Sequence, residues 1–249
     1  MPRFFIEPDE HDLTEGGMIL IDGENGRHLV RSLRIKPGES ITLCDSRGRD
    51  ILCSAKEIAG DSVEAVILKI NESDSEPDVK VHLYQCITKS DKFDYIVQKA
   101  VELGADSITP VASEFCVAKI DGKEEKKISR WQKIALEAAK QSGRGKIPQI
   151  NAPLRLSEAF TNSEGLKIMC YEHGGEPFTE LVKSNPLRGE KPQEISLFIG
   201  SEGGFSEKEV LCAEENGVKI ATLGKRILRT ETAPIAAIAV IMALTGNLE

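Results

Sequence analysis

Hydrophobic positions in residues 1–70 come in short bursts, MILID, SITLCD, DILCSAKEI and SVEAVILKI, with polar residues in between. The stretches that separate the bursts, DGENG, KPGE, SRGR and AGDS, are rich in glycine and charged residues, which is typical of turns. The pattern predicts a small β-barrel or sandwich. The acidic, serine-rich segment 71–78, NESDSEPD, follows, and because such a composition cannot bury itself we expect a linker there.

Beyond this segment, strand-like and helical patterns alternate. VKVHLYQCI and SITPVAS predict strands, and SDKFDYIVQKAVELGA between them predicts an amphipathic helix that ends at Gly104. Further strands at LKIMCY, EISLFIG and KIATL alternate with helices predicted at KKISRWQKIALEAAKQSG, at 206–216 and from Ala233 onward. Such alternation predicts a mainly parallel α/β sheet. We therefore expect two domains, residues 1–73 and residues 74–249.

Composition places the chain among globular proteins. Of its 249 residues, 40% are hydrophobic and 29% are charged. The start, MPRFFIEPDEHD, turns acidic before an apolar run develops, which argues against a signal peptide. The most apolar stretch, 235–244, is shorter than the roughly 20 residues of a membrane span, so we expect a cytoplasmic protein with no membrane segment.

Cysteine spacing and net charge narrow the choice of ligands. The six cysteines are scattered, without a C-x-x-C pair or a histidine at ligand spacing, so we expect reduced thiols and no metal site. A net charge of −8 argues against indiscriminate binding of nucleic acid. A local basic patch is nevertheless present within 27–49, and either RNA or solvent could cover it. Its members are Arg27, Arg31, Arg34, Lys36, Arg47 and Arg49.

The segment ISLFIGSEGGFSEKEV, residues 195–210, predicts a buried strand, a glycine-rich turn and the start of a helix. Ser206 and Glu209 have the spacing of a capping box. Gly200, Gly203 and Gly204 allow close approach of a ligand or a positive φ, although an ordinary tight turn remains an alternative. The segment lacks both the G-x-G-x-x-G dinucleotide motif and the Gly-Lys-Ser/Thr of a phosphate-binding loop.

A second segment, KIATLGKRILRTETA, repeats this design with a strand, Gly224 and then an apolar helix. Ligands of open α/β sheets bind outside the carboxyl ends of the strands. Two such loops on neighbouring strands would form one pocket, to which LKIMCYEHGG, with Glu172, could add a third wall. Backbone groups suit the edge of an adenine, and an apolar wall suits a thioether or sulfonium.

FIGSEGGFSEKEV together with LGKRILRTETAPIAAI resembles the signature of the SPOUT RNA methyltransferases, and within them the ribosomal RNA small subunit methyltransferase E family. Segments 28–39, 88–114 and 130–150 also resemble that family, so the likeness covers nearly the whole chain. Three positions differ from the family's usual residues: Ser201 replaces a proline, Phe115 an arginine and Ser32 a valine.

The resemblance implies an S-adenosylmethionine-dependent enzyme that methylates N3 of a uridine in the decoding region of 16S rRNA in the small ribosomal subunit. It also implies an α/β domain with a C-terminal trefoil knot, an N-terminal PUA-like RNA-binding barrel, and a homodimer whose partner completes each active site.

On this resemblance we assign candidate residues. Uracil N3 carries a proton at neutral pH, so a cation that stabilises the developing anion and a general base would both help. Arg229 is the candidate cation, unless it forms a structural ion pair, and Glu231 or Glu202 is the candidate base. Arg3, Arg31 and Arg34 are candidates for phosphate contacts. The cofactor would contact Glu172, Ile199, Gly200, Gly203, Gly204, Leu223, Gly224, Ile227 and Leu228.

Three other functions remain open on the sequence. The chain could methylate a different RNA, such as tRNA or large-subunit rRNA, or it could be a ribosome-assembly factor that keeps the pocket without turnover. A nucleotide-dependent oxidoreductase would need a dinucleotide motif that the chain lacks.

Overall fold

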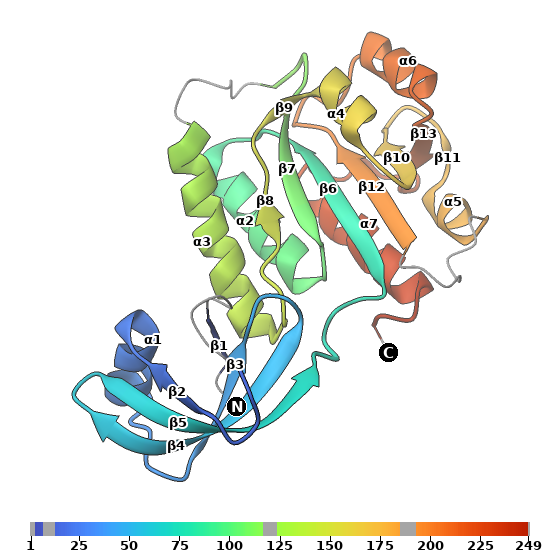
Figure 1. Cartoon of the computed structure of the whole chain (residues 1–249). Coiled ribbons are helices and arrows are strands. Elements are labelled where there is room, and N and C mark those ends of the chain that lie inside the picture. The colour runs from blue at the N-terminus through green and yellow to red at the C-terminus, as the bar shows by residue number, and fades with distance from the viewer. Residues whose placement is uncertain (1–2, 7–12, 117–123, 185–192, 249) are drawn as a thin grey trace. The chain divides into compact units, whose positions relative to one another are not determined.

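A computed structural model of the chain describes residues 3–6, 13–116, 124–184 and 193–248 (Figure 1). Contacts between α-carbons divide the chain into two compact units, residues 1–76 with 139–147, and residues 77–138 with 148–249. The predicted domain limits assign residues 139–147 to the second domain, whereas in the structure they pack with the first unit.

The first unit contains a five-stranded sheet with the strand order β1-β3-β4-β5-β2. Its pairs are antiparallel, except that β1 runs parallel to β3. Alternate residues of the strands fill one core, as Ile51, Cys53 and Ala55 of β4 show. Closure of this sheet into a barrel stays a prediction. The elements are β1 (Arg3–Phe5), β2 (Met18–Ile21), α1 (Gly23–Arg27), a π-helical turn (His28–Ser32), β3 (Ser40–Cys44), β4 (Arg49–Ala59) and β5 (Ser62–Glu72).

The turn that DGENG predicts is wrong, because this segment forms α1 and continues into the π-helical turn. The amide of Leu33 donates to the carbonyl of His28, 3.0 Å away, which closes the wide turn. A side chain at Gly26 would collide with backbone oxygens, since a Cβ there would lie 2.3 Å from the carbonyl oxygen of Asp61. The helix can therefore approach the sheet closely only with glycine at this position.

The acidic segment after β5 is held more firmly than its composition predicts. The Glu76 carboxylate accepts hydrogen bonds from the Arg144 guanidinium and from the amides of Gly145 and Lys146. The Arg144 side chain is 5% exposed and that of Glu76 is 13% exposed. A buried charge of this kind needs a partner and further hydrogen bonds, and Glu76 has both. Residues 139–147 therefore belong to the first unit.

The second unit contains an eight-stranded sheet in which every pairing is parallel, as predicted. The strand order is β11-β13-β10-β12-β6-β7-β8, with β9 paired to β7. The elements are β6 (Val79–Cys86), α2 (Ser90–Glu102), β7 (Ser107–Ala112), α3 (Glu124–Ser142), β8 (Gln149–Ile150), β9 (Leu154–Arg155), α4 (Leu156–Asn162), β10 (Leu166–Cys170), β11 (Glu176–Pro177), α5 (Phe178–Ser184), β12 (Gln193–Ile199), α6 (Glu207–Glu215), β13 (Lys219–Thr222) and α7 (Thr232–Leu244).

Helices cover both faces of the parallel sheet (Figure 1). On one face α7 packs against α2, α5, β6 and β12. On the other face α4 and α6 pack together, and Phe160 of α4 meets Phe198 of β12 edge to face with ring centroids 5.1 Å apart. Because both faces are covered, the central strands read as nearly continuous apolar runs. This arrangement leaves the carboxyl ends of the strands open for a ligand.

Candidate functional site

Three adjacent strands of the second unit, β13, β10 and β12, end at the same level. Cys170, the last residue of β10, is in register with Ile199 of β12 and Ala221 of β13. The loops that follow enclose a cavity of about 380 Å³, which is within the usual size of small-molecule sites. Its wall consists of residues 170–172, 199–202, 204 and 222–230, with Lys92 and Ala233.

The glycine-rich turn after β12 is tight. The amide of Gly204 donates to the carbonyl oxygen of Ser201, 3.0 Å away, and Gly204 has a φ of +67°. A Cβ at Gly204 would lie 2.2 Å from the Glu172 carboxylate, so glycine allows the loop after β12 to approach the loop after β10. The predicted capping box is confirmed, because Ser206 and Glu209 exchange side-chain and backbone hydrogen bonds at the start of α6.

A buried hydrogen-bond cluster ties the two main loops together. The hydroxyl of Thr230, which is 6% exposed, donates to the carbonyl oxygen of Gly200 at 2.7 Å. The amide nitrogen of Gln85, on β6, lies 3.3 Å from both that carbonyl oxygen and the Thr230 hydroxyl. The loop after β12 is thus fastened to the segment that leads into α7. Buried polar contacts of this kind fix one conformation when they are satisfied.

Lys92, on the first turn of α2, holds two carboxylates at one side of the cavity. Its Nζ lies 3.0 Å from Oε1 of Glu202 and 3.5 Å from Oε2 of Glu231. Desolvation is the largest single effect on Glu202 and favours its neutral form, but the hydrogen bond from Lys92, a backbone hydrogen bond and the charges of Lys92 and Lys89 together lower the pKa of the Glu202 carboxyl. The hydrogen bond to Glu202 correspondingly raises the pKa of Lys92. Both partners therefore stay charged at neutral pH.

Arg229 is exposed at the cavity and makes no ion pair with any residue that the structure describes. The alternative noted above, a structural ion pair with Glu202 or Glu231, is not formed, because Lys92 takes both carboxylates. Lys225 and Arg226 are exposed on the same loop. The loop after β13 therefore presents positive charge at the cavity, where an anion or a developing negative charge would be stabilised.

The cavity wall contains most of the residues predicted to bind the cofactor or to take part in catalysis. Two predicted residues lie outside it, the cofactor candidate Gly203 and the candidate base Glu231. Gly203 packs on Phe115, and the Oε2 of Glu231 is buried without a hydrogen bond, 3.5 Å from the Lys92 Nζ. The residues that do line the cavity are Glu172, Ile199, Gly200, Gly204, Leu223, Gly224, Ile227 and Leu228, with Arg229 and Glu202.

The three arginines predicted to contact RNA lie in the first unit and differ in their ion pairing and exposure to solvent. Arg3 pairs with Asp50 at 2.5 Å and donates to the carbonyl of Gly143, so a phosphate would have to displace these partners. Arg31 pairs with Asp61, also at 2.5 Å, but its side chain is 69% exposed. Arg34 is exposed, with a φ of +53°.

Metal-binding clusters and membrane-spanning helices are both absent from the residues that the structure describes. These residues contain no group of three or more His, Cys, Asp or Glu side chains able to hold a metal ion. Within the same part of the chain, no helix has the length and apolar character needed to cross a membrane.

Comparisons with known proteins agree with this geometry. Residues 75–242 match the RNA methyltransferase domain family, and residues 21–68 match the RNA methyltransferase PUA domain family. A ribosomal RNA small subunit methyltransferase E from Bacillus subtilis is 32% identical over 97% of this chain and 96% of its own length. The chain belongs to the ribosomal RNA small subunit methyltransferase E family.

Other family members support the same assignment. The protein of that name from Mesomycoplasma hyopneumoniae is 38% identical over 70% of this chain and 74% of its own length. A crystal structure of the Neisseria gonorrhoeae protein of that name, bound to S-adenosyl methionine, superimposes with a TM-score of 0.85 at 34% identity, and the match covers 98% of each chain. The fold of both units is therefore that of this family.

One departure from the family's usual residues, Ser201, contacts the backbone of another, Phe115. The hydroxyl of Ser201 donates to the carbonyl oxygen of Phe115 at 3.2 Å, and the same hydroxyl lies 3.4 Å from the amide of Gly203. A proline at this position would lack the hydroxyl. The glycine turn is thus anchored by a side-chain hydrogen bond to the turn that follows β7.

Several residues of the site escaped the sequence prediction. Lys92, Gln85 and Thr230 lie in segments with regular helical, strand and loop patterns, and nothing in those patterns distinguishes them. One weak signal existed for Lys92, a cation on the first turn of a helix, where it opposes the helix dipole and therefore needs a local anion. The two glutamates that it contacts are 110 and 139 positions away in the sequence.

Proposed function

We propose that this chain transfers a methyl group from S-adenosylmethionine to N3 of a uridine in the decoding region of 16S rRNA, in the small ribosomal subunit of the cytoplasm. The observation that carries the proposal is the cavity at the ends of β10, β12 and β13, with Arg229 exposed beside it and not ion-paired to any described residue. Membership of the family supports the reaction class, and the Neisseria gonorrhoeae protein was crystallised with S-adenosyl methionine bound.

The residues present suit an adenosyl group. A Cβ at Gly224 would meet nothing within 4 Å, so open space reaches the backbone of the second loop. Ile199, Leu223 and Leu228 supply apolar surface around that space, while the loops offer backbone groups for hydrogen bonds. When bound, S-adenosylmethionine supplies a methyl group that is activated by attachment to a sulfonium. The eight cofactor candidates that line the cavity would hold it in line with the substrate base.

Arg229 would stabilise negative charge on the uracil as N3 loses its proton. A preorganised cation in a site of this kind costs no rearrangement during the reaction. Glu202 reaches the cavity, but the hydrogen bond from Lys92 holds the pKa of its carboxyl low, which makes it a weak base. Glu231 does not line the cavity, and its Oε2 is buried 3.5 Å from the Lys92 Nζ. We therefore assign the larger share of N3 activation to Arg229.

The first unit would position the RNA. Its match to the RNA methyltransferase PUA domain family supports this role. Arg31 and Arg34, which are exposed, are better placed than Arg3 to contact phosphates, because Arg3 is engaged with Asp50 and Gly143. Such contacts fix the orientation of the RNA without reading its sequence.

A homodimer and a C-terminal knot complete the proposal. The outer positions of α7, among them Ile235, Ala236 and Val240, are apolar and only partly buried. An apolar stripe on the last helix suits a contact with a second copy of the chain. Return of the chain from β13, near one edge of the sheet, to α7 at its centre supports a knotted path.

The experiment is methyl transfer from radiolabelled S-adenosylmethionine to purified small subunits from a strain that lacks the enzyme. We expect label on one uridine of 16S rRNA, and mapping of the labelled nucleoside by mass spectrometry tests N3 as the acceptor. Label on tRNA or on large-subunit rRNA would favour a different RNA substrate. Binding to small subunits with no transfer of label would favour an assembly factor without turnover.

A further inference from the structure

Two cysteine sulfurs meet beside the cofactor cavity in a part of the second unit that the proposed reaction does not use. Cys86 is the last residue of β6 and is buried, whereas Cys116, in the turn after β7, is partly exposed. The Cys116 sulfur lies 3.7 Å from the carbonyl oxygen of Val111, the residue that pairs with Cys86 across β6 and β7, and Cys116 packs against the buried cluster that contains Cys86. The hydroxyl and the amide of Ser113 reach the same sulfur at 3.1 and 3.4 Å.

This environment makes the two thiols chemically different. The hydrogen bond from Cys86 and those from Ser113 together outweigh desolvation and lower the pKa of Cys116 to about 6. Burial and donation to Cys116 raise the pKa of Cys86 well above its ordinary value. At neutral pH a thiolate, which is the reactive form of cysteine, therefore lies against a protonated second thiol.

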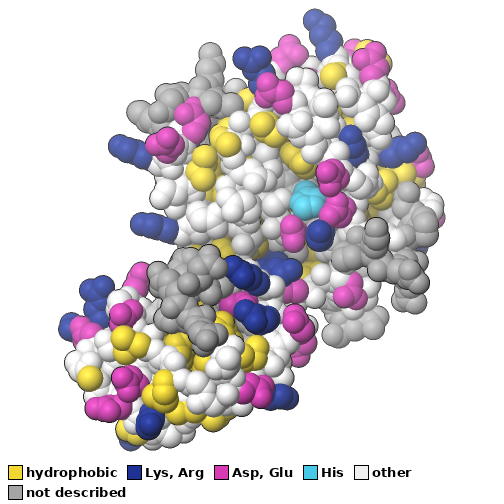
Figure 2. Space-filling model, viewed as in Figure 1, with side chains coloured by type: hydrophobic (Ala, Val, Ile, Leu, Met, Phe, Trp, Pro, Cys, Tyr) yellow, Lys and Arg dark blue, Asp and Glu magenta, His cyan; other side chains and the backbone are white. Residues whose placement is uncertain are grey.

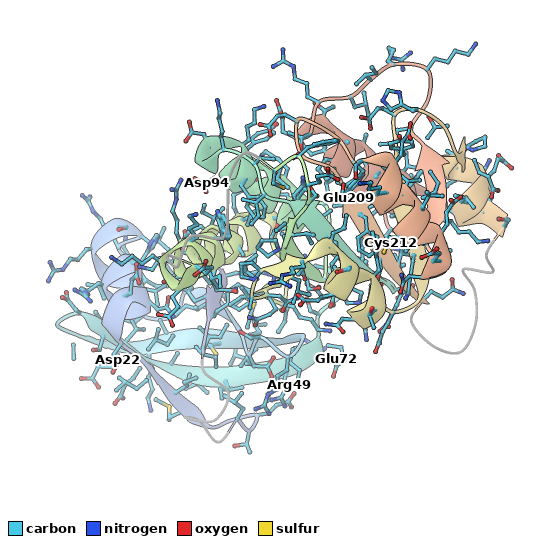
Figure 3. The ribbon with its side chains drawn as sticks, turned by 90° about the horizontal axis from the view of Figure 1, so that it is seen from above. Asp22, Arg49, Glu72, Asp94, Glu209 and Cys212 are labelled. Carbon is cyan, nitrogen blue, oxygen red and sulfur yellow. The ribbon has the colours of Figure 1, made fainter. Side chains whose placement is uncertain are left out.

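The turn that carries Cys116 also supports the glycine-rich loop of the cavity. The carbonyl oxygen of Phe115 accepts the Ser201 hydroxyl, and a Cβ at Gly203 would lie 2.7 Å from the Cβ of Phe115. The amide of Glu114 donates to the Glu209 carboxylate at 2.7 Å. Glu209 belongs to the capping box of α6 and is labelled in Figure 3. A shift of this turn would therefore move both ends of the loop.

We propose that Cys86 and Cys116 form a peroxide-sensitive dithiol whose oxidation to a disulfide weakens the binding of S-adenosylmethionine in the adjacent cavity. The effect on binding rests on the proposed function, whereas formation of the disulfide does not.

The oxidation balances with a peroxide as the oxidant. The Cys116 thiolate attacks one oxygen of the peroxide, which breaks the O–O bond, forms a sulfenic acid and releases hydroxide. The Cys86 sulfur then displaces the hydroxyl group from the Cys116 sulfur, and the Cys86 proton leaves with it as water. Both sulfurs are oxidised, and hydrogen peroxide is reduced to water. A dithiol reductant reverses the change by thiol–disulfide exchange.

A disulfide would change the support of the loop. The two sulfurs would have to approach to about 2 Å of each other to form the bond. The Cys116 sulfur would also lose its negative charge, so its hydrogen bonds from Ser113 would weaken. Because Phe115 is the neighbour of Cys116 and holds Ser201, the glycine-rich loop would lose its present anchor.

The experiment treats the full-length, reduced protein with one equivalent of hydrogen peroxide. Free thiols are then blocked, and peptide mass spectrometry identifies any linkage between cysteines. Calorimetry measures the affinity for S-adenosylmethionine before treatment, after it, and after dithiothreitol. Hydrogen exchange over residues 200–206 reports on the loop independently of binding.

Cys116→Ser and Cys86→Ala remove each partner, and circular dichroism checks that both variants fold. Cys212→Ser is the matched control, because Cys212 is also partly exposed, on α6 (Figure 3).

We expect a Cys86–Cys116 linkage, faster exchange over residues 200–206, and a rise of about tenfold in Kd, since a loop hydrogen bond is lost. Dithiothreitol should reverse all three changes, and the Cys212→Ser variant should behave as the wild type. In Cys116→Ser and Cys86→Ala, peroxide should leave both exchange and Kd unchanged.

The dithiol switch would be overturned by no linkage, by a linkage to another cysteine, or by a Cys86–Cys116 linkage that changes neither exchange nor Kd. Conversion of Cys116 to a sulfinic acid with Cys86 still reduced would also overturn it. If the reduced wild type takes up no S-adenosylmethionine, the proposed function fails and no binding exists to be weakened. The disulfide and the loop exchange would still decide whether the dithiol switch exists.

Discussion

At the scale of single residues, the loop after β13 carries three exposed cations at the cavity, Lys225, Arg226 and Arg229, that have no ion pair among the described residues. Lys92 pairs with both Glu202 and Glu231, and Arg229 is left exposed without an ion pair among the described residues. An unpaired cation is costly in a closed core, but at a cavity it is ready to stabilise a charge that develops in the substrate.

Replacement of Arg229 tests this arrangement. Arg229→Ala should lower the rate of methyl transfer by on the order of 10²–10³-fold, because the developing anion loses its stabilising cation. Binding of S-adenosylmethionine should change little. Lys208→Ala is the control, since Lys208 is an exposed cation on α6 outside the cavity wall. Single-turnover methyl transfer and calorimetry measure the two effects, and normal turnover by Arg229→Ala would contradict the role.

The reactivity of Cys116 should depend on pH. Above its pKa of about 6 the sulfur is a thiolate and reacts with iodoacetamide, and as the pH falls through that value the thiolate is protonated and the rate falls. Cys86 is the other thiol near this sulfur, and its raised pKa keeps it protonated across the transition. Mass spectrometry of the Cys116 peptide measures the rate. A midpoint at the ordinary cysteine value would contradict the assigned environment.

At the scale of elements, the cavity depends on how the loops after β12 and β13 are joined. Neither loop has a helix or strand of its own at the cavity wall, so side-chain hydrogen bonds must fix them. Thr230 and Gln85 supply these bonds, both to the carbonyl oxygen of Gly200. The loops should therefore be ordered before the ligand arrives, which lowers the entropic cost of binding.

Removal of the Thr230 hydroxyl tests whether its hydrogen bond to Gly200 holds the two loops together. Thr230→Val keeps the shape of the side chain but deletes a buried donor, and we expect a loss of about 1–3 kcal/mol in the free energy of unfolding. Thr245→Val is the control, because among the described residues the Thr245 hydroxyl bonds only to Ile241, Met242 and Asn247, at and just beyond the end of α7. Urea denaturation measures both. Equal stability of the two variants would show that the Thr230 hydroxyl does not hold the loops.

Local patterns predicted the elements better than they predicted the contacts. The glycines at 200, 204 and 224 marked the cavity loops in the sequence. A side chain would crowd its neighbours at Gly200 and Gly204, and Gly224 borders open space. The contact of Gln85 with Thr230 spans 145 residues, and no periodicity encodes such a pairing. The polar segment DGENG folds as a helix because tertiary packing against the sheet outweighs its weak helix propensity.

At the scale of the whole molecule, acidic and basic side chains are interspersed over each unit on the face that Figure 2 shows. A net charge of −8 agrees with this picture and disfavours tight binding to free RNA. On the proposed function, recognition would then depend on a few placed arginines and on the shape of the assembled subunit.

The proposed homodimer should depend on α7. Val240→Glu places a charge on the partly buried outer side of the helix, so burying that side against a second copy would become unfavourable. We expect light scattering to show monomers for Val240→Glu. Leu211→Glu is the control, because Leu211 is 60% exposed on α6. A dimer that survives in Val240→Glu would place the interface elsewhere.

The most direct test of the account is calorimetry of the reduced protein with S-adenosylmethionine, in the wild type, Gly204→Ala and Gly217→Ala. Both glycines have a φ near +70°, but only at Gly204 would a Cβ collide, with Glu172 at the cavity. The account predicts one site per chain in the wild type, weaker binding in Gly204→Ala and nearly unchanged binding in Gly217→Ala. No uptake by the folded wild type, or equal binding by all three proteins, would contradict it.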